Sequence, residues 1–232
     1  MGKRICALIL FFIISVNLNA CTTNRREDGL KDNESKLETT DDGMDKNASQ
    51  GDYDLSQDGI IKPKIAKELI EEIAEETIYA LSIKDAEAIS QSVHPVKGLR
   101  FTPYTYVSTE NDLVFNKGRM ENFFKDDQVY LWGFYDGIGD EIKLSPDQYY
   151  DEFIYSEDFI NAEAVGYNEI LTRGNMIENQ FEVYERPIVV EYYFSGFNPE
   201  YSGMDWRSLR LVFEEYEDDW KLVGIIHNQW TI

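Results

Sequence analysis

The sequence predicts an α+β fold, because helical patterns come first along the chain and strand-like segments follow. Two amphipathic or short helical patterns lie within residues 60–95, and the strand-like segments lie after residue 127. About 170 residues are enough to bury one sizeable hydrophobic core, so we expect a single globular domain over residues 60–232.

The longest helical pattern covers residues 63–82. Its apolar residues recur at spacings of three and four, while Lys and Glu fill the other side, and a proline opens the first turn. This pattern predicts an amphipathic helix. A shorter helix is expected over residues 85–93, ended by His94-Pro95. Ser, Pro and Asp at 145–147 are typical of a helix start, and predict a third helix that runs to about Phe153.

The second half of the chain is rich in β-branched and aromatic residues, which favour strands. We expect an antiparallel meander of the segments Gln128–Tyr135, Glu141–Leu144, Ala164–Leu171, Glu185–Ser195, Arg207–Tyr216 and Trp220–His227. The acidic turn at 217–219 joins the last two as a tight hairpin. Strict alternation would place Leu222 and Ile226 on one face of the last strand, and Val223 and Ile225 on the other.

This order of elements resembles the NTF2-like fold, in which N-terminal helices pack on a curved antiparallel sheet. The resemblance implies a cone-shaped cavity, which some members use for ligands or catalysis and others only for packing. The patterns H-P…G-x-R-F…Y at 94–104 and W…I-I-H-x-Q-W-T-I at 220–232 are also similar to uncharacterised extracytoplasmic lipoproteins of Gram-positive bacteria. That similarity implies no activity.

The first 21 residues have the pattern of a signal peptide that directs export. Lys3 and Arg4 precede about a dozen mostly apolar residues, the length of a signal-peptide core and short of a membrane span. The run ends in Leu18-Asn19-Ala20-Cys21, which resembles the lipobox of bacterial lipoproteins, although Asn19 departs from the usual residue there. The resemblance implies cleavage before Cys21, diacylglycerol on its sulfur, and anchoring by acyl chains such as palmitate to the outer face of the cell membrane.

Lipidation of Cys21 would leave the mature chain without a free thiol, because Cys6 lies in the signal peptide. Cysteine nucleophiles, disulfides and cysteine metal sites are then excluded. Residues 22–59 combine five basic and eleven acidic residues with few large apolar ones. We expect this segment to be a disordered acidic tether, because it cannot bury enough surface to offset its ordering entropy.

The net charge of the chain excludes some classes of binding partner. Lys and Arg number 22 against 44 Asp and Glu, a net charge of −22, and residues 60–232 alone carry −18. Nucleic-acid binding and polybasic membrane binding both need clustered cations. The sequence therefore predicts no nucleic-acid partner. P-loop, dinucleotide and zinc-protease motifs are absent, and no cofactor or metal is expected.

Two histidines are the candidates for acid–base chemistry. His227 ends the last strand and would act as acid or base if Asp205 or Asp136 orients it in a cavity. The alternative is a satisfied histidine at a strand end. His94 is interpreted as a cap after the second helix, with no partner visible in the sequence.

Two loops are further candidates. Asn198–Trp206 is rich in aromatic and turn residues, so Tyr201 and Trp206, with Trp230 near the end of the chain, are candidates for stacking on a sugar or a cation. The alternative is a turn whose Trp206 returns to the core. Asp136–Glu141 lacks the full ligand pattern of a calcium loop and fits a glycine-containing hairpin turn.

Three functions remain open from the sequence. The first is a lipid-anchored, non-enzymatic domain that binds a small molecule, a glycan or a protein. The second is an extracytoplasmic hydrolase or lyase that uses His227 with an acid. The third is a structural or scaffolding lipoprotein. The surroundings of His227 and the presence of a pocket with apolar walls distinguish them.

Overall fold

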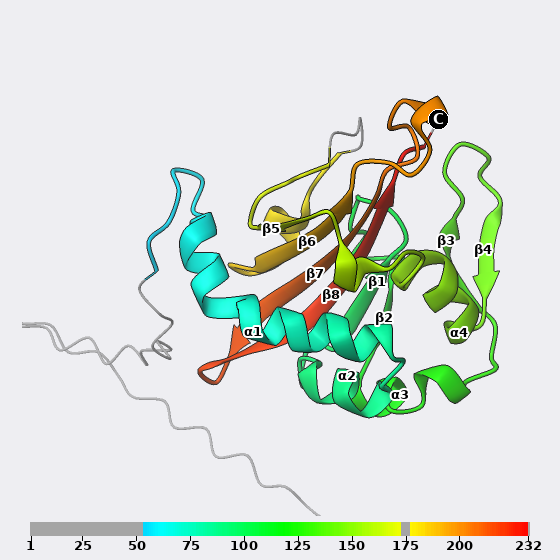
Figure 1. Ribbon diagram of the computed structural model, residues 1–232. Helices are drawn as coiled ribbons and strands as arrows, with labels where there is room; N and C mark the ends of the chain where they lie inside the picture. Colours follow the sequence, from blue (N-terminus) through cyan, green and yellow to red (C-terminus); the bar gives the residue numbers. More distant parts are fainter. Residues whose placement is uncertain (1–52, 173–176, 232) are drawn as a thin grey trace, which may run out of the picture. The chain divides into compact units, whose positions relative to one another are not determined.

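The computed structural model of the chain describes residues 53–172 and 177–231 (Figure 1). The signal peptide, the lipobox and residues 22–52 of the expected tether lie outside the described residues, so those predictions stay predictions. The described helices are α1 (Pro63–Ser82), α2 (Ala86–Ser92), α3 (Lys117–Met120), α4 (Pro146–Tyr149) and α5 (Gln180–Val183). Single helical turns are η1 (Phe123–Lys125), η2 (Tyr150–Ile154), η3 (Phe159–Asn161) and η4 (Pro199–Tyr201).

The strands form two sheets. They are β1 (Leu99–Thr102), β2 (Leu113–Phe115), β3 (Tyr130–Phe134), β4 (Glu141–Leu144), β5 (Ala164–Tyr167), β6 (Ile188–Phe194), β7 (Arg207–Tyr216) and β8 (Asp219–Gln229). A six-stranded sheet has the order β2-β1-β8-β7-β6-β5, and β3 pairs with β4 alone. The α+β class is confirmed.

The three predicted helices form where their start signals lie. The bounds of α1 match the predicted 63–82, and the Asp85 side chain caps α2 by accepting the Ala88 amide at 3.0 Å. Ser145 and Gln148 form a capping box at the start of α4. The chain then continues through Ile154 as the π-helical turn η2, so the predicted extent is right but the winding changes.

The strands β5 to β8 form the expected antiparallel meander. Glu217 and Asp218 both have positive φ angles, 49° and 64°, which match the twist of a two-residue hairpin. The hairpin of β3 and β4 is not part of this meander, and makes a sheet of its own.

The sequence predicts an antiparallel sheet, but the observed six-stranded sheet also contains a parallel pair of strands. The unpredicted strand β1 lies parallel to β8, with Phe101 opposite Ile225, and β2 pairs antiparallel on its other side. This pairing joins segments that are more than a hundred residues apart in the chain. Local sequence patterns carry no information about it, because the strand is only four residues long.

A β-bulge at Val223 changes the faces of β8. Val212 pairs with Gly224 and Phe213 with Leu222, so Val223 is the extra residue. After the bulge Ile225 packs on the same side as Leu222, while Ile226 packs with Val223 on the opposite side. The predicted strict alternation is therefore wrong beyond Leu222.

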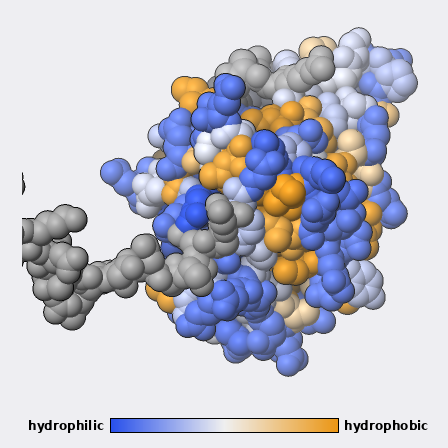
Figure 2. All heavy atoms as spheres, turned by 90° about the vertical axis from the view of Figure 1, so that its left-hand side faces the viewer, coloured by the Kyte–Doolittle hydropathy of each residue, from blue (hydrophilic) through white to orange (hydrophobic). Residues whose placement is uncertain are grey.

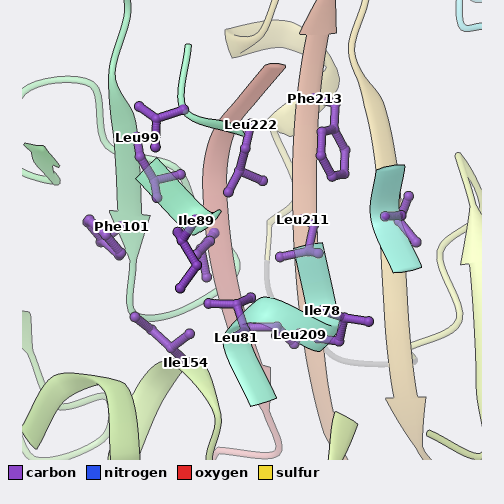
Figure 3. Packing of buried hydrophobic residues seen from close by; sticks show 14 of the residues in the cluster. Ile78, Leu81, Ile89, Leu99, Phe101, Ile154, Leu209, Leu211, Phe213 and Leu222 are labelled. Atoms are coloured by element: carbon purple, nitrogen blue, oxygen red, sulfur yellow. The ribbon is translucent and has the colours of Figure 1, made fainter. Parts of the chain in front are cut away.

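One face of the large sheet, here called the inner face, is covered by α1 and α2 (Figure 1). Figure 3 shows Leu209 and Leu211 of β7 facing Ile78 and Leu81 of α1. Beside them lies an interlocked set of buried rings, the aromatic stack, made of Phe101, Phe115, Phe123, Trp132, Tyr149 and Phe153. These rings come from β1, β2, η1, β3, α4 and η2 and fill the space between these elements.

The opposite, outer face carries a smaller apolar cluster and a buried charge network. The cluster consists of Val107, Tyr184, Val189, Val212, Val223 and Ile226. Arg210, which is fully buried on β7, donates to both carboxylate oxygens of Glu178 at 2.7 and 3.0 Å. Its Nε lies 3.1 Å from the buried Glu191, and its Nη2 donates to Thr172. This network fastens the chain around residues 172 and 178 to the sheet.

The expected tether is shorter at its C-terminal end than residue 59. Leu55 forms a β-bridge with Ile61, and the ring of Tyr53 lies 6.1 Å from that of Trp220. Lys62 pairs with Asp54 at 2.7 Å. Residues 53–59 are therefore part of the folded domain, because Tyr53 gains an aromatic contact that composition alone does not reveal.

Candidate functional site

His227 is buried against the aromatic stack rather than placed in an open site. It is 1% exposed on the inner face of β8, with its ring 5.5 Å from that of Phe153. Its Nε2 lies 3.4 Å from Gln229 Oε1, and among the described residues no carboxylate lies within ion-pair distance of it. Burial lowers the pKa of His227 to about 4, so the imidazole is neutral at pH 7.

The buried imidazole makes a testable contribution to stability. Because the folded pKa lies below the unfolded value of about 6.5, the unfolded chain takes up the proton first, and stability is lost as pH falls from about 6.5 to 4. We expect the free energy of unfolding of the wild type to lose about 3 kcal/mol relative to His227→Leu over that range. Urea titrations of both proteins at pH 7 and 4 measure this difference.

The comparison with His227→Leu is needed because a second group titrates in the same window. Burial raises the pKa of the Asp112 carboxyl to about 6, and the opposite sign of this shift lets stability rise as pH falls. In the wild type the pH dependences of stability from His227 and Asp112 partly cancel. The contribution of His227 alone is the difference in stability between the wild type and His227→Leu. An equal pH dependence in both proteins would show that His227 is not buried as a neutral ring.

The two acids proposed to orient His227 are engaged elsewhere. Asp205 accepts the amides of Phe197 and Asn198 at 3.0 and 2.7 Å, closing its own loop. Burial works to raise the pKa of Asp205, but these amide hydrogen bonds outweigh it and the net pKa is lowered. Asp136 is exposed in the turn between β3 and β4. The structure does not bring His227, Asp205 and Asp136 together into an acid–base site.

His94 holds the turn that follows α2 and does not cap the end of that helix, so the capping interpretation is wrong. Its Nδ1 accepts the amides of Val96 and Lys97 at 3.1 and 3.0 Å, and its ring packs edge-on against Tyr216. Burial lowers its pKa. A ring nitrogen that accepts two amide hydrogen bonds is not available as a base.

The candidate stacking residues separate into buried and exposed ones. Trp206 is 5% exposed and lies near Tyr193, so it returns to the core and is not a ligand platform. Tyr201 and Trp230 are 53% and 40% exposed. Residues 195–199 and Gly203 line a shallow hollow of about 210 Å³, and neither Tyr201 nor Trp230 is among its lining residues. Its open shape gives a sugar few converging polar groups.

The acidic loop at 136–141 is the hairpin turn that the glycines favoured. Tyr135 and Asp140 pair through their main chains at 2.8 Å, and Gly137 and Gly139 have positive φ angles of 79° and 74°. In the part of the chain that the structure describes, no group of three or more His, Cys, Asp or Glu side chains could hold a metal ion.

Two larger hollows lie on the surface of the described residues. One, of about 580 Å³, lies beside the junction of α1 and α2, where Lys84, Asp85, Glu87, Glu121, Phe124 and Lys125 form its walls. Lys84 is already paired with Asp147 and Asp151 at 2.7 and 3.0 Å and lies over the Tyr150 ring. Most of its polar groups are exposed and of mixed sign, which gives little basis for selectivity.

The second hollow, here called the outer pocket, encloses about 300 Å³ on the outer face of the sheet. Segments far apart in the chain form it: β1, β2, β7, β8 and the end of α5. Its lining residues are Lys97, Arg100, Thr109, Val114, Val183, Tyr184, Glu214 and Val223. The combination of apolar walls with a few convergent polar groups is typical of small-molecule sites.

Sequence reasoning did not single out the outer pocket. In the sequence Arg100 stands out only within the G-x-R-F pattern, Val223 only as part of the last predicted strand, and Tyr184 not at all. The signal that marks the site is the face change at the Val223 bulge together with Gly224, where a Cβ would collide with the Tyr184 hydroxyl. Neither feature is visible without the pairing of β7 and β8.

Hydrophilic residues dominate much of the visible surface, with hydrophobic residues in groups between them (Figure 2). This agrees with the high content of charged residues. Within residues 53–172 and 177–231, no helix is both long and apolar enough to cross a membrane.

Comparisons with known proteins give little further information. No family model and no curated protein matches the chain. Among solved structures, the chain is similar to a protein described as a calcium/calmodulin dependent protein kinase II association domain from Xanthomonas campestris. The identity is 10%, the match covers 69% of this chain and 84% of that one, and the TM-score is 0.27.

Proposed function

We propose that this protein is a lipid-anchored extracytoplasmic binding protein whose domain recognises a ligand at its surface. The observation that carries the binding assignment is the outer pocket, a hollow of about 300 Å³ walled by Val114, Val183 and Val223 with a guanidinium at its edge. The anchoring assignment rests on the sequence Leu18-Asn19-Ala20-Cys21 behind a signal-peptide pattern.

Catalysis at His227 is not favoured by any contact. An enzyme of the kind considered from the sequence needs a histidine in a concave site with a carboxylate at hydrogen-bond distance. His227 instead lies beneath the aromatic stack next to Phe153. A scaffolding role would require no pocket, and the outer pocket favours binding over it.

We also propose that the domain is NTF2-like, with the cavity of that fold filled by side chains. Support comes from the order of elements, with α1 and α2 preceding the sheet and packing on its inner face. In this proposal the aromatic stack occupies the interior, and ligand recognition falls to the outer face.

The anchor is tested by changing each cysteine in turn. Expressed from the full chain in a Gram-positive host, Cys21→Ala is expected to abolish labelling by a palmitate analogue. Cys6→Ala is the matched control, because the proposal places Cys6 in the discarded peptide. Palmitate labelling that persists in Cys21→Ala, or that is lost equally in Cys6→Ala, would contradict a lipid anchor on Cys21.

The binding role is tested separately with a library of neutral and charged small molecules. A ligand stabilises a protein by RT ln(1 + [L]/Kd), so a binder raises the melting temperature. We expect at least one compound to stabilise the wild type and not Val183→Trp, whose indole would fill the outer pocket. If every stabilising compound acts equally on both proteins, binding does not take place in this pocket.

A further inference from the structure

The outer pocket holds a guanidinium that main-chain carbonyl groups position. Arg100 Nη1 donates to the carbonyl of Ser108 at 3.1 Å and approaches that of Asp112 at 3.5 Å. Among the described residues, no carboxylate lies within 4.0 Å of this guanidinium. These carbonyl groups fix its orientation without a direct ion pair, although the nearby Asp112 carboxylate interacts with its charge, and its remaining N–H groups have capacity for an acceptor.

The other charged groups of the outer pocket are already paired with each other. Lys97 forms an ion pair with the buried carboxylate of Glu214, which also accepts the Glu185 amide at 2.8 Å. Among the described residues that line the pocket, Arg100 is therefore the cation without a direct ion pair, in a domain whose net charge is −18. A local cation in such an acidic protein indicates that the ligand is an anion.

Tyr184 adds a second polar group at the same place. It is 8% exposed, and its hydroxyl lies beside the Arg100 guanidinium without a hydrogen bond of acceptable geometry among the described residues. A phenol hydroxyl can donate a hydrogen bond as well as accept one, so its O–H could donate to an acceptor bound at Arg100. Gly224 makes this position accessible, since a side chain there would collide with the phenol.

The rest of the wall is apolar. Val114, Val183 and Val223 come from β2, the end of α5 and β8, and Thr109 closes the rim. A planar carboxylate matches the fork of a guanidinium in two parallel hydrogen bonds, whereas the valines offer nothing to a second charge. We infer that the outer pocket binds a small monocarboxylate with an apolar tail, with the carboxylate on Arg100 and the tail against the three valines. This inference rests on the proposed binding function and names the ligand class of that site.

The test uses the full-length protein in detergent and three probes: 4-methylpentanoate, its amide 4-methylpentanamide, and inorganic phosphate. Binding is followed by saturation-transfer NMR for the two organic probes and by calorimetry for all three. We expect the acid to bind with a dissociation constant of about 1 mM or below, at least tenfold more tightly than the amide or phosphate. Equal binding of acid and amide, or tighter binding of phosphate, overturns the inference.

Variants place the ligand. Arg100→Gln is expected to weaken binding of the acid at least tenfold, while Arg207→Gln, which also loses only a bond to a main-chain carbonyl and lies outside the pocket, leaves it unchanged. Arg100→Gln also removes a hydrogen bond to the loop at Ser108. A second pair of variants therefore tests the ligand position without that change. Val183→Glu should weaken binding at least tenfold relative to Val183→Gln, since only the former adds a negative charge.

The outcomes separate this inference from the proposed function. If a neutral compound from the library binds in a manner sensitive to Val183→Trp and no carboxylate does, the binding function stands and the ligand class is wrong. If neither acids nor neutral compounds bind at the outer pocket, both fail. Loss of acid binding in Arg207→Gln as well as in Arg100→Gln would mean that general charge, and not Arg100, attracts the acid.

Discussion

Replacing Arg210 by Met is expected to lower the free energy of unfolding by about 3–5 kcal/mol. Arg210 and Glu191 are both fully buried on the outer face of the sheet, with Arg210 Nε 3.1 Å from the carboxylate. Burial alone would lower the pKa of Arg210, but Glu191 and Glu178 outweigh it and raise the pKa, so the guanidinium stays charged. Removing the cation leaves the Glu191 charge buried, and denaturant unfolding at pH 7 measures the cost.

Two comparisons show whether the uncompensated charge is the cause. The double variant Arg210→Met/Glu191→Gln should recover a large part of the loss, because the amide can still accept the Ser208 hydroxyl now bonded to Glu191 at 2.7 Å. Arg207→Met, on the same strand with only a bond to a main-chain carbonyl, should cost under about 1 kcal/mol. A loss in Arg210→Met that is unchanged in the double variant would contradict this account and point to lost packing.

Trp132→Ala is expected to cost about 3–5 kcal/mol and to loosen the β3–β4 hairpin first. Trp132 lies in the centre of the aromatic stack, 3.8 Å from the Tyr149 ring at an interplanar angle of 12°, and its Nε1 donates to the Leu144 carbonyl at 2.9 Å. A two-stranded sheet is marginally stable alone, so this hairpin depends on its anchor in the core. Chemical denaturation measures the total loss.

Hydrogen exchange locates the effect of Trp132→Ala. Amides of β3 and β4 should exchange faster than those of β7 and β8 in the variant, since local opening needs less energy than global unfolding. Leu131→Ala is the matched control, because Leu131 is next to Trp132 in the chain but its side chain is exposed to solvent. Equal acceleration across both sheets would show that the hairpin and the main sheet open together.

Elements with strong local signals were predictable. The apolar spacing and opening proline of α1 define its bounds, and the capping residues Asp85 and Ser145 fix where α2 and α4 begin. The strands β4 and β7 also match the predicted segments. These signals act within a few residues, so tertiary contacts reinforce them without altering them.

Structural features that depend on pairing between segments far apart in the chain were not predictable. β1 and β2 are short and gain their identity by pairing along β8, and the bulge at Val223 moves Ile225 and Ile226 to opposite faces from those expected. The predicted acid–base site at His227 was wrong for the same reason. His227 and Asp205 looked like partners by residue type, but their positions follow from strand register and from a loop that Asp205 closes on itself. The residues of the outer pocket meet only after the sheet has formed.

The position of β8 sets the timing of folding. This strand lies between β7 and β1 in the centre of the sheet, yet it is made after every other strand. The sheet cannot close before residue 229 has been synthesised, and closing it joins segments separated by most of the domain, which makes folding slow. A nascent chain truncated before β8 has no completed core. For a protein proposed to be exported, this delay would keep the chain unfolded, as threading through a narrow translocation channel requires.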